Sequence, residues 1–539
     1  MAADRQGNGG VPIVLTAPRS EISTYSGDPF TAFVAVFPRK LIPALIVKDE
    51  WLEAENNEDG TARFLPYGLR KVESLLIEEF GEENVVSVHP DNLHQFVGPR
   101  TKVVGISTMD AMGLAYVSLT YNSILGIGGE SLDAFEFEQL MRNPVLSQYG
   151  PKIIVGGAGS WQVRNAGKME ELGVDTLVHG EGENAIPDLF RRALNDESLP
   201  KEVYGRTVKT DDIPLIKRAA SYGVVEITRG CGRGCYFCSP TNRVRNSLPL
   251  DHIMKEVETN IRGGANSIFT ATEDMFIYQC GPKFVPNREA VVKLYKSIAE
   301  FPGVEYIHLS HASIAPAVYD PKMVEELTPI LEEKTLYTPK LRKRYKRRFA
   351  TVLFGIESGS VRIMEKYMRG KALPYEVKDW HEIVTQGIGI FNDNGWRPMG
   401  TIITGWPGET EDDTVQTLEL LDKLKDADLF YVPLLFIPLQ DSRLRDERMM
   451  PLESLTDAQL DFLATCWRYN IDCWDEKLKP IYSMVSIISY YLYFRWKHGK
   501  KFKLPSFRVA GLHPGLYLRE FRECDRQVCS EQLTPRMGE

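Results

Sequence analysis

The chain has 539 residues, 43% of them hydrophobic, and carries 64 basic against 73 acidic side chains, a formal net charge of −9. This length and apolar content support a large core and favour two to four domains. The negative charge excludes a general attraction to nucleic-acid backbones or anionic membrane surfaces. Eight cysteines are too few for a disulfide scaffold, and the start, MAADRQGNGG, lacks the pattern of a secretion signal. We therefore expect a cytoplasmic protein without a nucleic-acid partner.

The first 205 residues alternate short β-rich runs with helical stretches, which predicts a doubly wound α/β domain with a parallel sheet. Residues 69–80 have helical spacing, and residues 121–147 form an insertion of a kind that often covers a binding site. The β-rich runs end in Pro, Gly, Ser or Thr, which suits a ligand at the carboxyl edge of the sheet. The expected strands lie in 11–18, 83–90, 101–108, 151–157 and 174–182.

A second alternating series follows a polar linker at 201–220 and predicts a partial or full α/β barrel over 221–445. Its expected strands lie in 224–228, 266–272, 304–310, 350–358, 398–408 and 428–438. Residues 446–539 are helix-rich and aromatic, and we expect a third, smaller domain there. The most apolar run, 481–496, is shorter than the ~20 residues of a spanning helix, so no membrane span is expected. A buried helix is the favoured interpretation of this run, and a membrane-surface element is the alternative.

The sequence TRGCGRGCYFCSP at 228–240 places Cys231, Cys235 and Cys238 in a C-x3-C-x2-C pattern after the first barrel strand. Three thiolates on one short loop can ligate three irons of a [4Fe–4S] cluster and leave the fourth iron open to a small molecule. The interspersed glycines allow a tight loop, and Arg229 and Arg233 are candidates to offset cluster charge. A zinc site that combines these thiols with a distant cysteine is the alternative.

This loop, with an aromatic residue before its last cysteine, resembles the signature of the radical S-adenosylmethionine (SAM) superfamily, and the resemblance extends over about 221–445. It implies that SAM chelates the open iron and is cleaved to a 5′-deoxyadenosyl radical. Three segments resemble the family's SAM contacts: 272–274 for the amino group, GIESGS at 355–360 for the ribose, and GWPGET at 405–410 near the adenine. The SAM-binding residues that the resemblance implies are Phe237, Glu273, Asp274, Glu357, Ser358 and Gly405.

The N-terminal domain resembles the cobalamin-binding domain of some radical SAM proteins, through residues 103–108, 153–160 and 172–183. Glycines after these strands leave room for a flat corrin across the sheet edge. The corrin border that the resemblance implies consists of Ser107, Thr108, Asp110, Gly156, Gly157, Gly180 and Glu181. The segment STMDAMG at 107–113 has no histidine where cobalt-ligating domains carry D-x-H-x-x-G, so we expect no histidine below the metal. A domain that has lost its cobalamin is the alternative.

Two other groups of residues are interpreted as ordinary structure. Residues 340–348 hold seven basic side chains in nine, and a solvated helix face is favoured over a nucleic-acid patch because no aromatic platform accompanies them. Four loosely spaced cysteines are interpreted as buried or surface thiols, with a second metal site as the alternative: Cys466, Cys473, Cys524 and Cys529. No hydrolase or kinase motif is found in the sequence, and no catalytic residue is assigned.

Together the resemblances imply a cobalamin-dependent radical SAM methyltransferase that uses a [4Fe–4S] cluster, SAM, cobalamin and an electron donor. Such an enzyme methylates an unactivated sp3 carbon. The opening segment at 16–30 and the acidic composition resemble archaeal members, among which one methylates the Cα of a glutamine in methyl-coenzyme M reductase. A protein substrate is therefore expected. The alternatives are a lipid substrate, for tetraether ring formation or hopanoid-type methylation, and a cobalamin sensor without radical chemistry.

Overall fold

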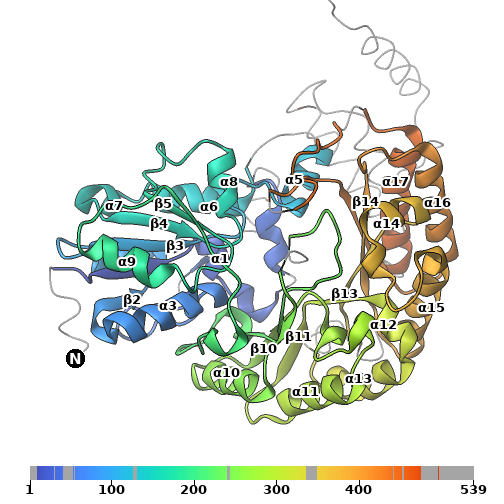
Figure 1. Ribbon diagram of the computed structural model, residues 1–539, viewed down its shortest axis with the longest axis horizontal. Coiled ribbons are helices and arrows are strands. Elements are labelled where there is room, and N and C mark those ends of the chain that lie inside the picture. The colour runs from blue at the N-terminus through green and yellow to red at the C-terminus, as the bar shows by residue number, and fades with distance from the viewer. Residues whose placement is uncertain are drawn as a thin grey trace, which may run out of the picture.

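The computed structural model describes residues 9–29, 31–39, 52–53, 55–125, 130–239, 243–335, 349–440, 442–451, 454–474 and 496, without the side chains of 125 and 471–474. Figure 1 shows an N-terminal part in blue to teal beside a larger part in green to orange. The predictions for the basic segment 340–348, the apolar run 481–495 and the thiols of Cys473, Cys524 and Cys529 lie outside the described residues.

Six parallel strands form the N-terminal sheet in the order β2-β1-β3-β4-β5-β6. They are β1 (Ile13–Thr16), β2 (Val85–Ser87), β3 (Val103–Ser107), β4 (Lys152–Gly156), β5 (Thr176–His179) and β6 (Glu202–Tyr204). The five predicted strands are confirmed. They consist of short Val, Ile and Leu runs that are buried on both faces, as expected of a parallel sheet between helices.

The sixth strand was predicted as part of the linker, and this prediction is wrong for Glu202–Tyr204, which pairs with β5. None of its three residues is buried, because β6 is the edge strand of the sheet. An edge strand needs no continuous apolar run, so the sequence carried little signal for it.

Helices cover both faces of this sheet (Figure 1), which confirms the doubly wound domain. The helices α3 (Tyr67–Phe80) and α9 (Ile186–Leu194) pack on one face. The other face is covered by α4 (Leu93–Phe96), α6 (Leu132–Met141), α7 (Pro144–Tyr149) and α8 (Ser160–Asn165). Two helices lie near the carboxyl edge, α1 (Arg19–Ile22) and α5 (Tyr116–Leu125).

The second part is a partial barrel of parallel strands, as predicted. One run pairs β7, β10 and β11, and the next pairs β12, β13, β14 and β15. Only Ser310 separates β11 from β12, so the two are counted as one interrupted strand. In this count the described barrel has six strands. The strands are β7 (Val224–Glu226), β10 (Ser267–Ala271), β11 (Tyr306–Leu309), β12 (His311–Ala312), β13 (Leu353–Glu357), β14 (Met399–Thr404) and β15 (Phe430–Leu435).

Amphipathic helices surround the barrel and bury their apolar sides in one continuous core. They are α10 (Leu250–Arg262), α11 (Arg288–Glu300), α12 (Ile314–Tyr319), α13 (Pro321–Glu333), α14 (Val361–Tyr367), α15 (Trp380–Asp393) and α16 (Glu411–Lys423). The α16 helix begins with a capping box, in which Thr410 and Asp413 satisfy each other's amides.

The last described helix, α17 (Asp457–Trp474), packs against α16 and β15. Its Phe462, Leu463 and Cys466 are fully buried members of the barrel core. The described part of 446–539 is therefore attached to the barrel, and a separate C-terminal domain stays a prediction. The buried Cys466 agrees with its interpretation as a small apolar side chain.

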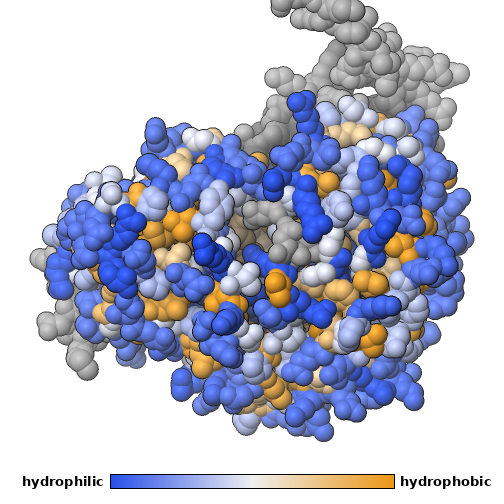
Figure 2. All heavy atoms as spheres, viewed as in Figure 1, coloured by the Kyte–Doolittle hydropathy of each residue, from blue (hydrophilic) through white to orange (hydrophobic). Residues whose placement is uncertain are grey.

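Apolar side chains are spread over the visible face in small patches among hydrophilic ones (Figure 2). Within the described residues, no helix has the length and apolarity needed to cross a membrane.

Candidate active site

The three-cysteine loop joins two short antiparallel strands, β8 (Thr228–Arg229) and β9 (Asn246–Ser247), at the carboxyl end of β7. The φ angles of its glycines are +71° at Gly230, +76° at Gly232 and +80° at Gly234, a region that favours glycine. A Cβ at Gly230 would lie 2.8 Å from the carbonyl oxygen of Val244, so the returning strand leaves no room for a side chain. The two ends of the loop therefore pack closely together at Gly230.

Burial raises the pKa of all three thiols, that of Cys235 to about 11. Charge on Cys231 and Cys235 adds to the shift of Cys238, so the thiols lie within electrostatic reach of one another. Lys371 opposes the shift at Cys235 and Cys238, and Arg233 opposes it at Cys231 and Cys235. Thiolates are needed as ligands, and bound iron would supply the positive charge that keeps them ionised.

Within the described residues, no three His, Cys, Asp or Glu side chains converge on a point where a single metal ion would sit. A four-iron cluster takes its cysteines on different irons, so its ligands surround it and do not converge. Three neighbouring thiols on one tight loop fit such a cluster.

Asp274 is fully buried and its carboxylate is already bonded. Its Oδ1 accepts from the amides of Phe276 at 3.0 Å and Ser313 at 3.1 Å, and its Oδ2 accepts from Arg233 Nη2 at 2.9 Å. Arg233 also donates to the carbonyl oxygen of Gly370 at 2.8 Å. Asp274 thus ties the cysteine loop to the barrel, and its predicted contact with SAM stays a prediction.

Glu273 is the available acid of this segment. No described residue donates a hydrogen bond to its carboxylate, and its side chain is exposed at the mouth of the barrel. Surrounding protein withdraws part of its hydration and raises its pKa, an effect that Glu226 reinforces and Arg243 opposes. An incoming ammonium group would meet an unpaired acceptor here.

Glu357 stands at a β-bulge in β13 with φ +66°, a strained conformation for a non-glycine residue. It is 6% exposed, and its Oε1 lies 2.8 Å from Nζ of Lys371. Thr401 donates to Oε2 at 3.2 Å, and Lys371 donates to the carbonyl oxygen of Gly355 at 2.9 Å. A Cβ at Gly355 would lie 2.0 Å from Nζ of Lys371 and 2.2 Å from Oε1 of Glu357, so a side chain there would displace the ion pair. Sequence reasoning missed Lys371, which belongs to no motif.

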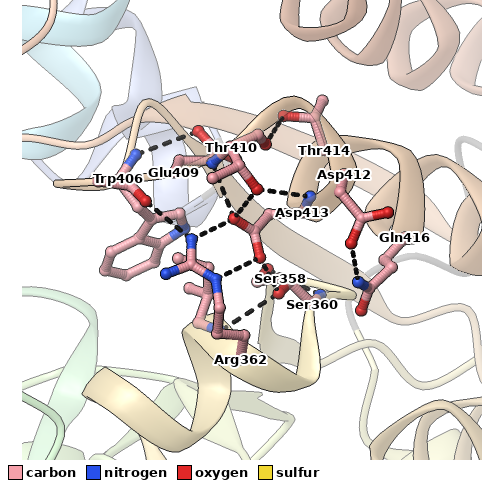
Figure 3. Close-up of polar contacts among 12 residues, drawn as sticks. Ser358, Ser360, Arg362, Trp406, Glu409, Thr410, Asp412, Asp413, Thr414 and Gln416 are labelled. Carbon is pink, nitrogen blue, oxygen red and sulfur yellow. Dashed lines mark hydrogen bonds and ion pairs between the residues drawn. The ribbon is translucent and has the colours of Figure 1, made fainter.

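The two glycine-rich turns are joined through Asp413 (Figure 3). Ser360 Oγ donates to Asp413 Oδ1 at 2.5 Å, Arg362 pairs with both carboxylate oxygens, and Thr410 donates to Oδ2. These charged and neutral donors hold the pKa of Asp413 well below its ordinary value, although burial opposes the shift. Ser358 is 1% exposed and its Oγ accepts from the Ser360 amide at 3.0 Å, so it shapes the turn from within. Its predicted contact with SAM stays a prediction.

Phe237 and Gly405 lie where the cysteine loop meets the turn at 405–410. The Phe237 ring packs edge-on against Trp406, with centroids 5.2 Å apart. Gly405 has φ +81° and donates its amide to Glu409 Oε2 at 2.5 Å. The predicted SAM residues Phe237, Glu273, Glu357 and Gly405 thus lie on elements that converge at the carboxyl end of the barrel.

A cavity of about 270 Å³ lies between the N-terminal sheet and the helices α3 and α9. Its floor is apolar, and a Cβ at Gly105 would lie 2.7 Å from Leu15 and 2.9 Å from Phe190. Its outer end reaches Arg229 and Arg243, which flank the cysteine loop. Five of the residues predicted for the corrin border line this cavity: Ser107, Gly156, Gly157, Gly180 and Glu181.

Thr108 and Asp110 do not line this cavity; they hold the loop after β3. The carbonyl oxygen of Thr108 accepts from Gly159 N at 2.8 Å. Asp110 accepts from Ala115 N at 3.0 Å and Gln162 Nε2 at 2.8 Å, and also from Ser118 Oγ. Both residues are buried, and their predicted contact with the corrin stays a prediction.

Arg229 joins the two parts of the protein. Its guanidinium lies 2.7 Å from Glu183 and 3.3 Å from Glu181, both after β5, and 2.9 Å from Glu226 at the end of β7. Its charge is therefore neutralised by carboxylates, and the structure does not support the expectation that it offsets a cluster. Arg229 instead fixes the sheet edge against the barrel.

Helix α5, at the start of the predicted insertion, forms a second bridge. Tyr116 donates its hydroxyl to the carbonyl oxygen of Phe237 at 2.7 Å, and Thr120 Oγ1 accepts from the amide of Leu435 at 3.2 Å. The helix thus contacts both the cysteine loop and the last barrel strand, and it closes one side of the space between sheet and barrel.

An acidic cluster at the sheet edge predicts a pH-dependent stability. Burial raises the pKa of Asp133 to about 7, and Asp110 and Glu136 add to the shift, although Ser20 donates to its carboxylate at 2.5 Å. The folded chain therefore keeps a proton that the unfolded chain releases above about pH 4, and stability falls as pH rises from about 4 to 7. In Asp133→Asn this part of the loss is absent, and we expect it to gain about 1–3 kcal/mol over the parent between pH 5 and 8. Urea unfolding of the parent and the variant at about pH 5 and about pH 8 measures this difference in the free energy of unfolding. The same change of that free energy with pH in both proteins would contradict the prediction.

Comparison with known proteins identifies part of the chain. Residues 225–421 match the family model of the Radical SAM superfamily. The tRNA-2-methylthio-N(6)-dimethylallyladenosine synthase of Marinomonas sp. (strain MWYL1) is 24% identical over 294 residues, which cover 53% of this chain and 59% of that protein. The synthase of the same name from Fusobacterium nucleatum subsp. nucleatum is 28% identical over 261 residues, 47% of this chain and 52% of that protein. The chain therefore spans little more than half the length of these curated relatives.

Among solved structures, the fold is similar to TsrM from Kitasatospora setae, a radical S-adenosylmethionine methyltransferase with cobalamin and a [4Fe–4S] cluster bound. The TM-score is 0.53 at 13% sequence identity, and the match covers 80% of this chain and 74% of TsrM. A second structure of TsrM, with tryptophan substrate and a SAM analog bound, matches equally well, with a TM-score of 0.53. Residues 225–421 thus match the Radical SAM superfamily, and the fold of the chain, with its doubly wound N-terminal domain, is similar to that of TsrM.

Proposed function

We propose that this protein is a cobalamin-dependent radical SAM methyltransferase that methylates an unactivated sp3 carbon. The observation that carries the proposal is the continuity between two sites. The cavity of the N-terminal sheet, lined by Gly156, Gly157 and Glu181, reaches the two arginines that flank the cysteine loop. A methyl donor at the sheet edge would therefore lie next to the place where a radical is generated.

The chain's own residues have defined tasks in this proposal. Cys231, Cys235 and Cys238 would hold the cluster, and the unpaired carboxylate of Glu273 would accept the ammonium group of SAM. Glu357, held by Lys371 and Thr401, would present its remaining acceptor capacity to a ribose hydroxyl. When bound, the cluster, SAM and cobalamin supply the radical and the methyl group.

The glycine edge would border the corrin without a histidine below the cobalt. The backbone there leaves no room for side chains, since a Cβ at Gly157 would lie 2.5 Å from the carbonyl oxygen of Thr108. The half-buried Glu21 accepts from the amide of Met109 at 2.7 Å and thereby fixes the loop that faces this edge. A rigid, glycine-lined border suits a large flat ligand.

For the substrate, we propose the Cα of a glutamine in methyl-coenzyme M reductase, on the resemblance of residues 16–30 to archaeal members; this implies a cytoplasmic site and a dedicated electron donor. A lipid is the second candidate, and it is favoured by a largely apolar cavity inside the barrel, whose lining has no Asp, Glu, Lys or Arg among the described residues. A cobalamin sensor without radical chemistry has less support, because all three cysteines of the loop are present.

Anaerobic reconstitution of the full chain with iron, sulfide, cobalamin, SAM and a reductant tests the reaction. We expect 5′-deoxyadenosine and S-adenosylhomocysteine to form together once substrate is added. Absence of 5′-deoxyadenosine with the cluster and cobalamin loaded would overturn the proposal.

A strain that lacks the gene tests the substrate. Mass spectra of its methyl-coenzyme M reductase, its membrane lipids and its tRNA nucleosides are compared with those of the parent strain. Loss of methylation on the glutamine alone would support the protein substrate, and a change in lipids alone would support the second candidate. Loss of a methylthio group from tRNA would instead assign the activity for which the sequence relatives are named.

A further inference from the structure

Helix α5 of the N-terminal part brings the side chain of Tyr116 to the cysteine loop of the barrel. The Tyr116 hydroxyl donates to the carbonyl oxygen of Phe237 at 2.7 Å, and no other described residue donates to that oxygen. Phe237 lies between Cys235 and Cys238 in the chain, and Tyr116 lies 121 positions before it. One backbone group of the cysteine loop is therefore satisfied only by a residue of the other part of the protein.

The ring of Phe237 contacts two other aromatic rings. The Tyr116 ring lies edge-on to it, with centroids 6.2 Å apart and an interplanar angle of 76°. The Trp406 ring, on the turn at 405–410, also lies edge-on, with centroids 5.2 Å apart and an angle of 82°. Edge-on pairs favour one relative position of two rings beyond the effect of burial alone. Tyr116 thus holds Phe237 twice, through its backbone and through its ring.

The hydroxyl of Tyr116 lies inside the candidate site. Burial raises the pKa of Tyr116, and negative charge on Cys238, Glu357 and Cys235 adds to the shift. The hydroxyl is therefore within electrostatic reach of two proposed cluster ligands and of the acid proposed for the ribose. Because its pKa lies above the ordinary value of about 10, the hydroxyl keeps its proton and remains a donor at physiological pH.

Helix α5 is held on both sides of Tyr116. Before it, the amide of Ala115 donates to Oδ1 of Asp110 at 3.0 Å, which ties the start of the helix to the loop after β3. After it, Thr120 Oγ1 accepts from the amide of Leu435 at 3.2 Å, which ties the helix to the last barrel strand. Tyr116 therefore approaches the cysteine loop from a fixed position.

We propose that Tyr116 is a positioning residue for SAM, which completes the SAM site of the barrel from the N-terminal part by fixing Phe237. The inference rests on the proposed function, since it adds a residue to the SAM site of that proposal. A ring that is already fixed loses little freedom when a ligand packs against it, so its contact contributes more to affinity. Tyr116 acts through Phe237 and is assigned no contact with SAM of its own.

Equilibrium binding of SAM to the full chain tests the proposal, with the cluster loaded but oxidised so that SAM is not cleaved. Tyr116→Phe removes the hydrogen bond and keeps the ring. We expect it to raise the Kd for SAM about two- to tenfold, the effect of one neutral hydrogen bond. Tyr116→Leu also removes the edge-on contact and should raise the Kd about ten- to a hundredfold.

A double-mutant cycle with Phe237→Leu tests whether Tyr116 acts through Phe237. In a chain that already carries Phe237→Leu, we expect Tyr116→Leu to change the Kd for SAM less than about threefold, because the ring that it would position is absent. A purely structural role of Tyr116 would leave the two effects additive. Additive effects would therefore overturn the proposal.

Tyr121→Phe is the matched control, because it makes the same exchange on the same helix and keeps the ring contacts with Phe37 and Trp467. It should bind SAM like the parent. Iron analysis shows whether each variant holds its cluster, and Tyr116→Phe decides if Tyr116→Leu does not. Unchanged SAM affinity in an iron-loaded Tyr116→Phe would overturn the proposal. Because binding is measured without turnover, SAM binding that depends on Tyr116 in a chain that forms no 5′-deoxyadenosine would refute the proposed reaction alone.

Discussion

Replacing Cys238 with alanine is expected to abolish assembly of the iron–sulfur cluster and with it all SAM cleavage. Cys238 is partly buried on the loop that also carries Cys231 and Cys235, and its replacement leaves two thiols for the three irons that need a protein ligand. Loss of an outer-shell partner costs a metal site about 10–100-fold, and loss of a direct ligand should cost more. Iron analysis should fall from about four per chain to less than one, and 5′-deoxyadenosine should fall to background.

Cys280→Ala is the matched control, because this half-buried thiol lies outside the loop. It should retain its iron and its visible absorption. Loss of metal from this variant would identify Cys280 as a fourth ligand and would favour the alternative of a closed zinc site. Full iron content in Cys238→Ala would contradict the cluster assignment itself.

Lys371→Met is expected to destabilise the protein by about 3–5 kcal/mol, because it leaves the carboxylate of Glu357 buried without its counter-ion. The ion pair is 2.8 Å long, and its side chains are only 16% and 8% exposed. The double variant Lys371→Met, Glu357→Gln removes both charges and should recover most of that loss. Urea unfolding of the parent, both single variants and the double variant gives the coupling energy, which we expect to exceed about 1 kcal/mol.

Lys371→Arg is the control for charge alone. A guanidinium is wider than an ammonium group, and Nζ of Lys371 already sits close to the backbone of Gly355, so arginine should recover only part of the stability. Titration of the folded variants with SAM then separates stability from binding. If Lys371→Met unfolds like the parent and binds SAM equally well, the pair has no role at the site.

The sequence predicted the fold well wherever a segment is buried on both sides. Apolar runs such as 103–107 and 430–435 indicated central strands, and the six barrel runs all became strands, because central parallel strands require continuous apolar sequence. The edge strand β6 was not predicted, because an edge strand needs no continuous apolar run. Composition also does not reveal that Phe462 and Leu463 of α17 pack into the barrel core, and a separate C-terminal domain stays a prediction.

The site residues also separate into those that local sequence predicted and those that it did not. Residues that must occupy one short loop, such as Cys231 and Cys235, were found from spacing alone, and so were the glycines where a Cβ would collide with backbone. Carboxylates were harder to assign, because an acid at a strand end looks the same in sequence whether it is free or bonded. Among the described residues none donates a hydrogen bond to the Glu273 carboxylate, whereas that of the adjacent Asp274 accepts three.

The amino-acid sequence by itself indicated the three-cysteine loop, the parallel α/β architecture and the glycine edge, because each depends on residues close together in the chain. Only the tertiary structure decided which distant groups meet. It paired Lys371 with Glu357, turned Arg229 into a clamp between sheet and barrel, and brought the hydroxyl of Tyr116 to the cysteine loop. Such contacts depend on how separate strands and helices pack, and no local spacing in the sequence records them.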